Sequence, residues 1–382
     1  MHQIIIALLI VLLLLPVLPA YAEENIFYTS SPDALSVFLN DIAYARDEIN
    51  LPGDSDVQII LPATVYQDTL LVYENDQRVP SYRLRVQDNH IVLRWKTSGD
   101  ANLHAVRLEY LMRGISWKPD YDMWIVDDEN VQFDFFAELR NATLSLKDVP
   151  VQLIAGRVDT NQVVSTVTTV TLNQYFAGYD DFGNANAFPP QSADSPELSG
   201  TASIQHIYDA GTITSEPGEF VYMAVLQSAL TARKVLLWNA GSDNEVTVIY
   251  KIQNTTEQPF AEGIVRSYEK GLFLGSDFVE HTPIGSEGSV TVGGLQTVRV
   301  NRESTRTYEE NDSNRDYHNV VELTISNFDE ETIEMDVVDI YPDGASRFEI
   351  DDEAKQEIGN RLRWTITVEP GETVVLRYEY WT

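Results

Sequence analysis

The sequence predicts an all-β protein built as two consecutive antiparallel β-sandwich-like domains. Apolar and polar residues alternate with period two along many short segments, which are rich in Val, Ile, Thr, Tyr and Phe. Gly, Pro, Asn and Asp separate these segments, as turns between strands require. Helical periodicity is nearly absent: only 32–44 and 351–358 admit a helical interpretation, which we do not adopt. Short strands at this spacing are typical of sandwiches.

The predicted strands follow one another along the whole chain. They lie at 57–61, 69–73, 81–86, 90–95, 131–139, 149–154, 162–172, 235–238, 245–252, 290–292, 297–301, 320–326, 332–340, 362–368 and 373–380. Leu-Arg-Trp occurs twice, ending at Trp95 and at Trp364, and each copy precedes a strand that ends in Glu-Tyr. This internal similarity places both indoles in a sandwich core and supports a first domain that ends near Met112.

The first 22 residues have the features of a signal peptide. The apolar run from Ile4 to Leu15 is shorter than the ~20 residues that span a bilayer, and Ala20-Tyr21-Ala22 forms a cleavage site. An uncleaved membrane anchor is the alternative, because the segment before the apolar run is weakly charged. No later segment is apolar enough to cross a membrane. We expect an exported protein, secreted or at the cell surface, without a membrane span once the signal is cleaved.

The predicted domains are 23–112 and a larger second domain, 113–382. The second domain carries a low-complexity insert, 175–203, in which Gly, Asn, Ser, Pro and Ala dominate, and we expect a flexible loop there. The insert also contains aromatic residues, which either contact a partner or pack back on the parent sheet: Tyr175, Phe176, Tyr179, Phe182 and Phe188. Trp117 and Trp124 are two further candidate interaction residues, although both are equally compatible with a core.

Composition excludes several functions. The chain has no cysteine, which rules out thiol catalysis, thiolate zinc sites and iron–sulfur ligation. Asp and Glu number 59 against 26 Lys and Arg, a net charge of −33, which disfavours nucleic acid and anionic lipid as partners. Three explanations of the acidic surface are open: it keeps the protein soluble, it suits a salty habitat, or it binds cations. The first two are favoured.

No catalytic, cofactor or metal site is predicted. The histidines are scattered, and no metalloprotease, nucleophile-elbow or phosphate-loop motif occurs. The segment 312–316 begins like a calcium loop, but Tyr317 and Leu323 stand where Gly and Glu are required. Asp120 and Asp122, on one face of a strand, are the acid pair on which an alternative function, hydrolysis of envelope glycans or peptides, depends. Candidate glycosylation sites are Asn141, Asn254 and Asn311, each in an Asn-x-Ser/Thr sequence.

Two segments resemble a known family. The residues from Tyr110, YLMRGISWKPDYDMWI, and the later segment KIQNTTEQPFAEGIVRSYEKGLFLGS carry its pattern of turn and core residues: Gly114, Trp117, Pro119, Tyr121, Asn254, Pro259, Gly263 and Gly275. The chain resembles the C-terminal domain of the mucoidy inhibitor A-like family (domain of unknown function 4139) over 110–382, and more faintly its N-terminal domain from Leu35.

The resemblance implies two β-domains on an exported chain and no reaction. The residues that match the family pattern look structural: they shape turns and fill cores. Two features depart from it: the coiled coil between the family's domains is missing, and a Trp expected near Leu146 is absent. We therefore expect a non-enzymatic interaction or structural module of the cell envelope, with an envelope protein or glycan as its partner and an oligomeric state that the sequence leaves open. Self-assembly into a surface layer is a further alternative.

Overall fold

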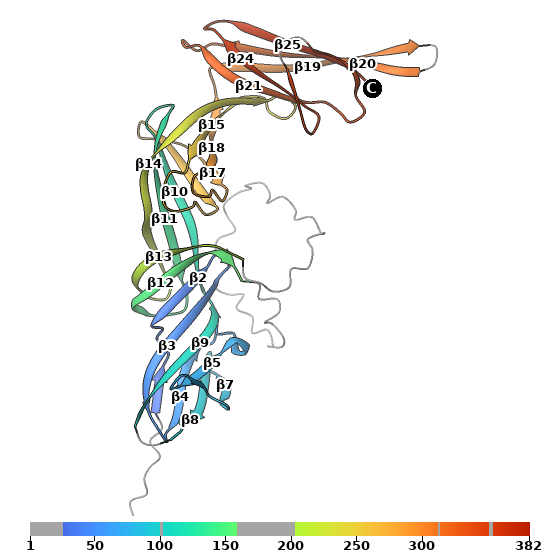
Figure 1. Ribbon diagram of the computed structural model, residues 1–382. Helices are drawn as coiled ribbons and strands as arrows, with labels where there is room; N and C mark the ends of the chain where they lie inside the picture. Colours follow the sequence, from blue (N-terminus) through green and yellow to red (C-terminus); the bar gives the residue numbers. More distant parts are fainter. Residues whose placement is uncertain (1–25, 100–101, 159–202, 312–313, 351–353) are drawn as a thin grey trace, which may run out of the picture.

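The computed structural model describes residues 26–99, 102–158, 203–311, 314–350 and 354–382, and these form an elongated row of β-structures (Figure 1). The all-β prediction is confirmed: in the described residues the only helical element is a 3-10 turn, η1 (Gln67–Thr69). None of them forms a helix with the length and apolar character that crossing a membrane requires. The predicted signal, the predicted strand 162–172 and residues 175–202 of the predicted insert lie outside the described residues.

The N-terminal part of the chain is a two-sheet sandwich. One sheet holds β1 (Ile26–Thr29), β4 (Asp56–Pro62), β8 (His90–Lys96) and β7 (Arg83–Gln87). The other begins with β2 (Ala34–Phe38), β3 (Ile42–Pro52), β9 (Leu103–Arg113), β5 (Leu71–Glu74) and β6 (Gln77–Arg78). The period-two pattern is visible in burial, because Ile91, Leu93 and Trp95 face the core while the residues between them do not.

This second sheet extends across the boundary predicted near Met112. It gains β12 (Leu146–Arg157), which pairs in parallel with β2, and then β13 (Ser203–Ser215). Strand β9 runs on into β10 (Ile115–Ile125) through Gly114 alone, whose φ is 93°. A Cβ at this position would collide with the Thr143 side chain, so both the backbone angle and the close approach require glycine.

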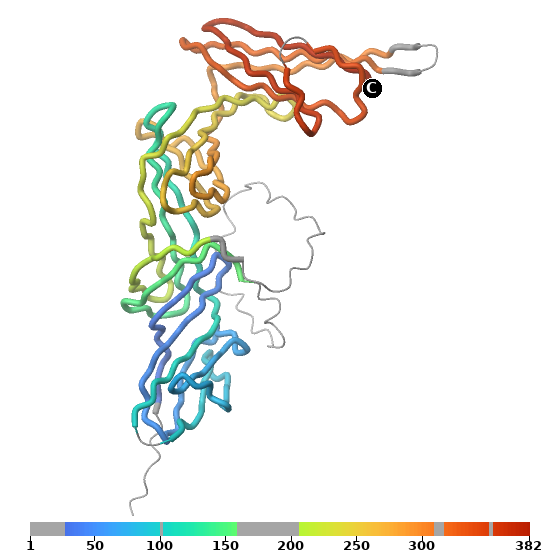
Figure 2. Tube along the Cα trace, in the orientation of Figure 1, coloured from blue at the N-terminus to red at the C-terminus, as the bar shows by residue number. Residues whose placement is uncertain are grey.

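The middle of the molecule is a strongly curved sheet that nearly closes into a barrel (Figure 2). Its strands are β17 (Leu272–Val279), β16 (Gly263–Glu269), β10, β11 (Asn130–Asn141), β14 (Glu219–Asn239), β15 (Val246–Gln253) and β18 (Glu287–Leu295). Strand β18 lies beside β17 without a backbone ladder; the Thr291 N–H donates to Asp277 Oδ2 at 2.6 Å. Aromatic residues fill the interior, where Tyr121 stacks on Phe135 at 4.6 Å and on Phe133 at 5.2 Å.

The C-terminal part is a second sandwich with its own core. The end of β14 pairs with β21 (Ile333–Ile340), which is followed by β24 (Arg361–Val368) and β23 (Lys355–Glu357). The opposite sheet holds β19 (Val298–Asn311), β20 (Asn314–Asn327), β25 (Thr373–Trp381) and β22 (Ser346–Ile350). Trp364 is buried in this core, as Trp95 is in the first, which confirms the prediction for both indoles. The long strand β14 thus belongs to both the barrel and the C-terminal sandwich.

Candidate interaction surface

Strand β10 turns one set of side chains into the barrel and the alternate set outward. Tyr121 and Met123 are buried in the interior, whereas Asp120, Asp122 and Trp124 lie on the outer face. The Trp124 side chain is 40% exposed. An exposed apolar side chain indicates a binding site only where others are grouped with it, so its neighbours on the outer face matter.

Trp124 is at one end of an aromatic stack that crosses three strands and has Tyr268 in its middle. Its direct partner across the parallel pair β10–β16 is Tyr268, and the two ring centroids are 4.3 Å apart with planes inclined by 17°. Tyr268 in turn contacts Phe273 on β17, 5.6 Å away. The stack therefore presents three aromatic side chains side by side on the outside of the barrel.

The register places further apolar residues on the same outer face. Ile264 on β16 pairs with Asp120 on one side and Phe278 on the other, and on β14 Tyr222 pairs with Glu138. We call the following set the aromatic face: Trp124, Tyr222, Ile264, Tyr268, Phe273 and Phe278. Except for the half-buried Tyr268, each has a large exposed surface. Grouped apolar exposure of this kind marks binding sites in proteins.

The charged groups between these apolar residues form ion pairs with one another. Arg266 Nε lies 2.8 Å from Asp122 Oδ1, and Arg266 Nη2 lies 2.8 Å from Asp120 Oδ2. The hydrogen bond to Asp122 is the main cause that raises the pKa of Arg266. Lys118 pairs with Glu138 at 3.0 Å. The three carboxylates Asp120, Asp122 and Glu138 thus outnumber the two cations by one, and the aromatic face carries only a small net negative charge.

The structure separates the two tryptophans that the sequence grouped as candidates. Trp117 is 2% exposed, donates from Nε1 to the Ile154 carbonyl at 3.0 Å, and meets the edge of Tyr208 at 5.7 Å. Only Trp124 reaches the surface. The five aromatic candidates of the insert lie outside the described residues.

The candidate glycosylation sites Asn141 and Asn254 are both buried and shape turns. Asn141 Nδ2 donates to the Leu144 carbonyl at 2.6 Å, and Asn254 Nδ2 donates to the Gln258 carbonyl at 3.0 Å. In this fold the nitrogen atoms that a glycan would occupy are hydrogen-bonded to the backbone. Asn311 ends β19, where the hairpin to β20 turns.

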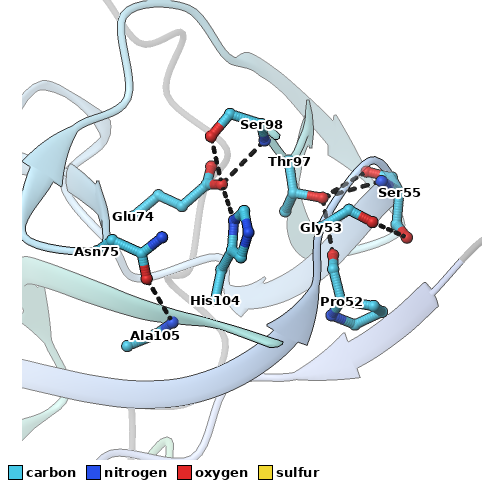
Figure 3. A network of polar contacts seen from close by, with 9 residues as sticks. All are labelled: Pro52, Gly53, Ser55, Glu74, Asn75, Thr97, Ser98, His104 and Ala105. Atoms are coloured by element: carbon cyan, nitrogen blue, oxygen red, sulfur yellow. Dashed lines mark hydrogen bonds and ion pairs between the residues drawn. The ribbon is translucent and has the colours of Figure 1, made fainter. Parts of the chain in front are cut away.

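A polar cluster at one end of the N-terminal sandwich brings together a serine, a histidine and an acid (Figure 3). Glu74 Oε1 accepts from the Ser98 N–H at 2.9 Å and the Ser98 hydroxyl at 2.8 Å, and it contacts His104 Nδ1. Burial raises the pKa of Glu74, but the hydrogen bonds from His104 and Ser98 outweigh this and lower it. A catalytic triad needs the serine hydroxyl on the imidazole, whereas this one is bound to the carboxylate. The cluster ties Ser98, which follows β8, to Glu74 on β5 and, through Glu74, to His104 on β9.

Sequence reasoning missed most of the aromatic face. Arg266, Tyr268, Phe273 and Phe278 lie more than 140 residues after Trp124 in the chain, and the parallel pairing of β10 with β16 brings them beside it. The only local signal is the alternation in 264–268, where Ile264, Arg266 and Tyr268 share a face.

A family model, described as a domain of unknown function (DUF4139), matches residues 106–382, which is well over half of the chain. The chain belongs to the DUF4139 family. A comparison with curated proteins gives no match. The DUF4139 region begins within β9 and includes the barrel, with the whole aromatic face, and the C-terminal sandwich.

The residues that carry the family resemblance have structural roles in this DUF4139 domain. A Cβ at Gly263 would lie 2.8 Å from the Pro119 carbonyl oxygen and 2.8 Å from the Tyr121 ring, so glycine allows β16 to approach β10. Tyr121 donates its hydroxyl to the Ala261 carbonyl at 2.7 Å, which fixes the segment that leads into β16. These positions build the sheet on which the aromatic face stands.

Proposed function

We propose that the chain is a non-catalytic, exported or cell-surface binding protein that captures an envelope protein or glycan through the aromatic face. The observation that carries this proposal is the exposed stack of Trp124, Tyr268 and Phe273 on the outer side of the barrel. Aromatic side chains are enriched at binding sites because they offer a large apolar contact area with little conformational entropy to lose.

The strand framework supports a binding role. Trp124, Tyr268 and Phe273 are on paired strands rather than on loops, so their relative positions are fixed before a partner arrives. Preorganisation of this kind reduces the entropy lost on binding. The small net charge of the face favours an uncharged, amphiphilic partner surface over a strongly charged one.

The alternative of a hydrolase finds less support. Asp120 and Asp122 share a strand face, but Arg266 binds both, and their side chains are only 10% and 21% exposed. Hydrolysis by a carboxylate pair needs both groups to reach the scissile bond and its water. Here the pair is better explained as a link between β10 and β16.

The relation to the mucoidy inhibitor A-like family is part of the same proposal. The DUF4139 match and the pattern from Gly114 to Tyr121 support it, while the direct passage from β9 into β10 leaves no place for the coiled coil of that family. We infer a form of the family that lacks the coiled coil and retains the two β-regions and an envelope location.

A capture experiment with matched variants tests the proposal. The protein with Phe273→Ser is compared with the protein carrying Phe328→Ser, because Phe273 and Phe328 are 59% and 61% exposed but only Phe273 is on the aromatic face. We expect Phe273→Ser to weaken capture of partners from solubilised envelope at least tenfold, and Phe328→Ser to leave it unchanged. Equal capture by both variants would refute the assignment of this face.

A further inference from the structure

The core of the N-terminal sandwich contains a carboxylate without a compensating cation. Asp47 on β3 is fully buried. It accepts a hydrogen bond from the Ser30 hydroxyl at 2.5 Å, and the Tyr110 hydroxyl lies 3.4 Å away. The Ser30 and Tyr110 hydroxyls are themselves 2.7 Å apart. Among the residues that the structure describes, no Lys, Arg or His forms an ion pair with Asp47.

The other titratable groups around Asp47 do not relieve its charge. Tyr28 on β1 and Tyr110 on β9 are neutral, and Asp33, in the segment between β1 and β2, is a second carboxylate. Burial, reinforced by the charge of Asp33, raises the pKa of Asp47 to about 6 against the hydrogen bonds from the Ser30 and Tyr110 hydroxyls and the Ser31 backbone. The adjacent residues Arg46 and Glu48 are exposed on the opposite side of β3, where they pair with each other.

A second buried aspartate shows what Asp47 lacks. Asp339 in the C-terminal sandwich is also fully buried and also bonded to a core tyrosine, with Tyr378 donating its hydroxyl at 2.7 Å. Arg302 Nε lies 2.9 Å from Asp339 and compensates its charge. The two sandwiches thus share an Asp–Tyr contact, but only one of them includes a cation.

The structure above Asp47 includes a short edge strand of the sandwich. Strand β1 is short, lies at the edge of its sheet and pairs with β4 alone. Ser30 follows it directly and donates its N–H to the Ile60 carbonyl at 2.9 Å. An ionised carboxylate in the core is stabilised by access to water, and the nearest cover to open is this first strand with the segment 30–33.

We propose that Asp47 is a proton-operated latch for the N-terminal strand. In a mildly acidic medium the neutral carboxyl group bonds to Ser30 and Tyr110 and holds β1 and 30–33 against the sandwich. In a neutral or alkaline medium the ionised carboxylate favours the opened form, in which water reaches it and β1 leaves β4. The attachment of β1 to the sandwich then depends on the pH of the medium.

Hydrogen exchange of the purified protein tests this latch. The protection of amides in 26–31, corrected for intrinsic exchange rates, should fall roughly tenfold between pH 5 and pH 8 in the wild type, as linkage to the carboxyl group requires. Asp47→Asn should abolish this dependence. Asp339→Asn, the matched control, should retain it, because Asp339 lies in the other core. A constant protection in the wild type, or an unchanged dependence in Asp47→Asn, overturns the proposal.

A second variant covers the case in which Asp47→Asn does not fold. Tyr110→Phe removes one hydroxyl that favours the ionised carboxylate and keeps the ring in the core. It should enlarge the fall in protection between pH 5 and pH 8 relative to the wild type. A smaller fall in Tyr110→Phe than in the wild type also contradicts the latch.

Discussion

Trp117 and Trp124 are on the same strand yet have opposite environments. Trp117 contributes to the core and donates a hydrogen bond to the Ile154 carbonyl, whereas Trp124 stacks on Tyr268 on the outer face. Alternation along β10 predicts that the two point to opposite sides. The alternation does not say which side is buried, because that depends on β12 and β13, which cover Trp117 from far along the chain.

Alanine substitution of the two tryptophans should separate their roles. Trp117→Ala should lower the free energy of unfolding by about 3–5 kcal/mol, since it leaves a cavity and an unpaired carbonyl in the core. Trp124→Ala should lower it by about 1 kcal/mol, the worth of one aromatic contact. Urea denaturation followed by circular dichroism measures both. Similar losses for the two variants would contradict the separation of core from surface.

The ion pair of Asp339 with Arg302 gives a second prediction. Asp339→Ala leaves a guanidinium partly buried without its partner, and we expect the free energy of unfolding to fall by about 2–3 kcal/mol. The value is below that for a fully buried pair because Arg302 retains some contact with solvent. Thermal unfolding of the variant at neutral pH checks it, and a loss below about 0.5 kcal/mol would show that the pair is not stabilising.

At the level of the single element, strand alternation predicted the all-β class and many of the strands, but it missed others, among them β2, β3, β13, β16 and β17. The predicted strands within the described residues coincide with parts of β4, β5, β7, β8, β11, β12, β14, β15, β18, β19, β20, β21, β24 and β25. The two segments with a possible helical interpretation, 32–44 and 351–358, instead contain β2 with the start of β3, and β23. Alternation does not predict which strands pair with each other. The parallel pairs β2–β12 and β10–β16 join distant segments, and the second of these creates the aromatic face.

The approach of β16 to β10 depends on one small residue. Gly263→Ala would place a methyl group against the Pro119 carbonyl and the Tyr121 ring, and we expect a loss of about 2–3 kcal/mol. Gly359→Ala is the control, because its Cβ meets no neighbour and only the left-handed backbone, φ 84°, opposes it, at about 1 kcal/mol. Differential scanning calorimetry should show the larger fall in midpoint for Gly263→Ala. The reverse order would refute this role for Gly263.

At the scale of the whole molecule, pH acts on stability in two opposite directions. The raised pKa of Asp47 contributes stability that is fully present below about pH 4 and is lost as pH rises to about 6. The lowered pKa of Glu74 contributes stability that is present above the pH range in which a glutamate usually titrates. This stability is lost as the pH falls through the lowered pKa. Stability should therefore fall by about 1 kcal/mol between pH 5 and pH 8, and Asp47→Asn should reduce this fall. Denaturation midpoints across this range measure it, and an identical fall in the variant would contradict it.

The net charge of −33 predicts a response to salt. Sodium chloride raised from 0.05 M to 1 M should increase the melting temperature, because it screens repulsion among carboxylates. The described residues contain no cluster of three or more potential metal ligands. Calcium at millimolar concentration, compared with sodium chloride at matched ionic strength, separates screening from cation binding. A calcium-specific rise in melting temperature would instead support the cation-binding explanation of the acidic surface.

The claim that this DUF4139 protein binds a partner through its aromatic face is tested most directly by crosslinking in cells. A photo-reactive amino acid replaces Phe273 in one strain and Phe328 in another, and each is also combined with Trp124→Ala. We predict a discrete crosslinked species from position 273 only, lost when Trp124 is removed. Its mass and composition distinguish an envelope protein, a glycan and a second copy of this chain. No crosslink at 273, or the same products from 273 and 328, would contradict the claim.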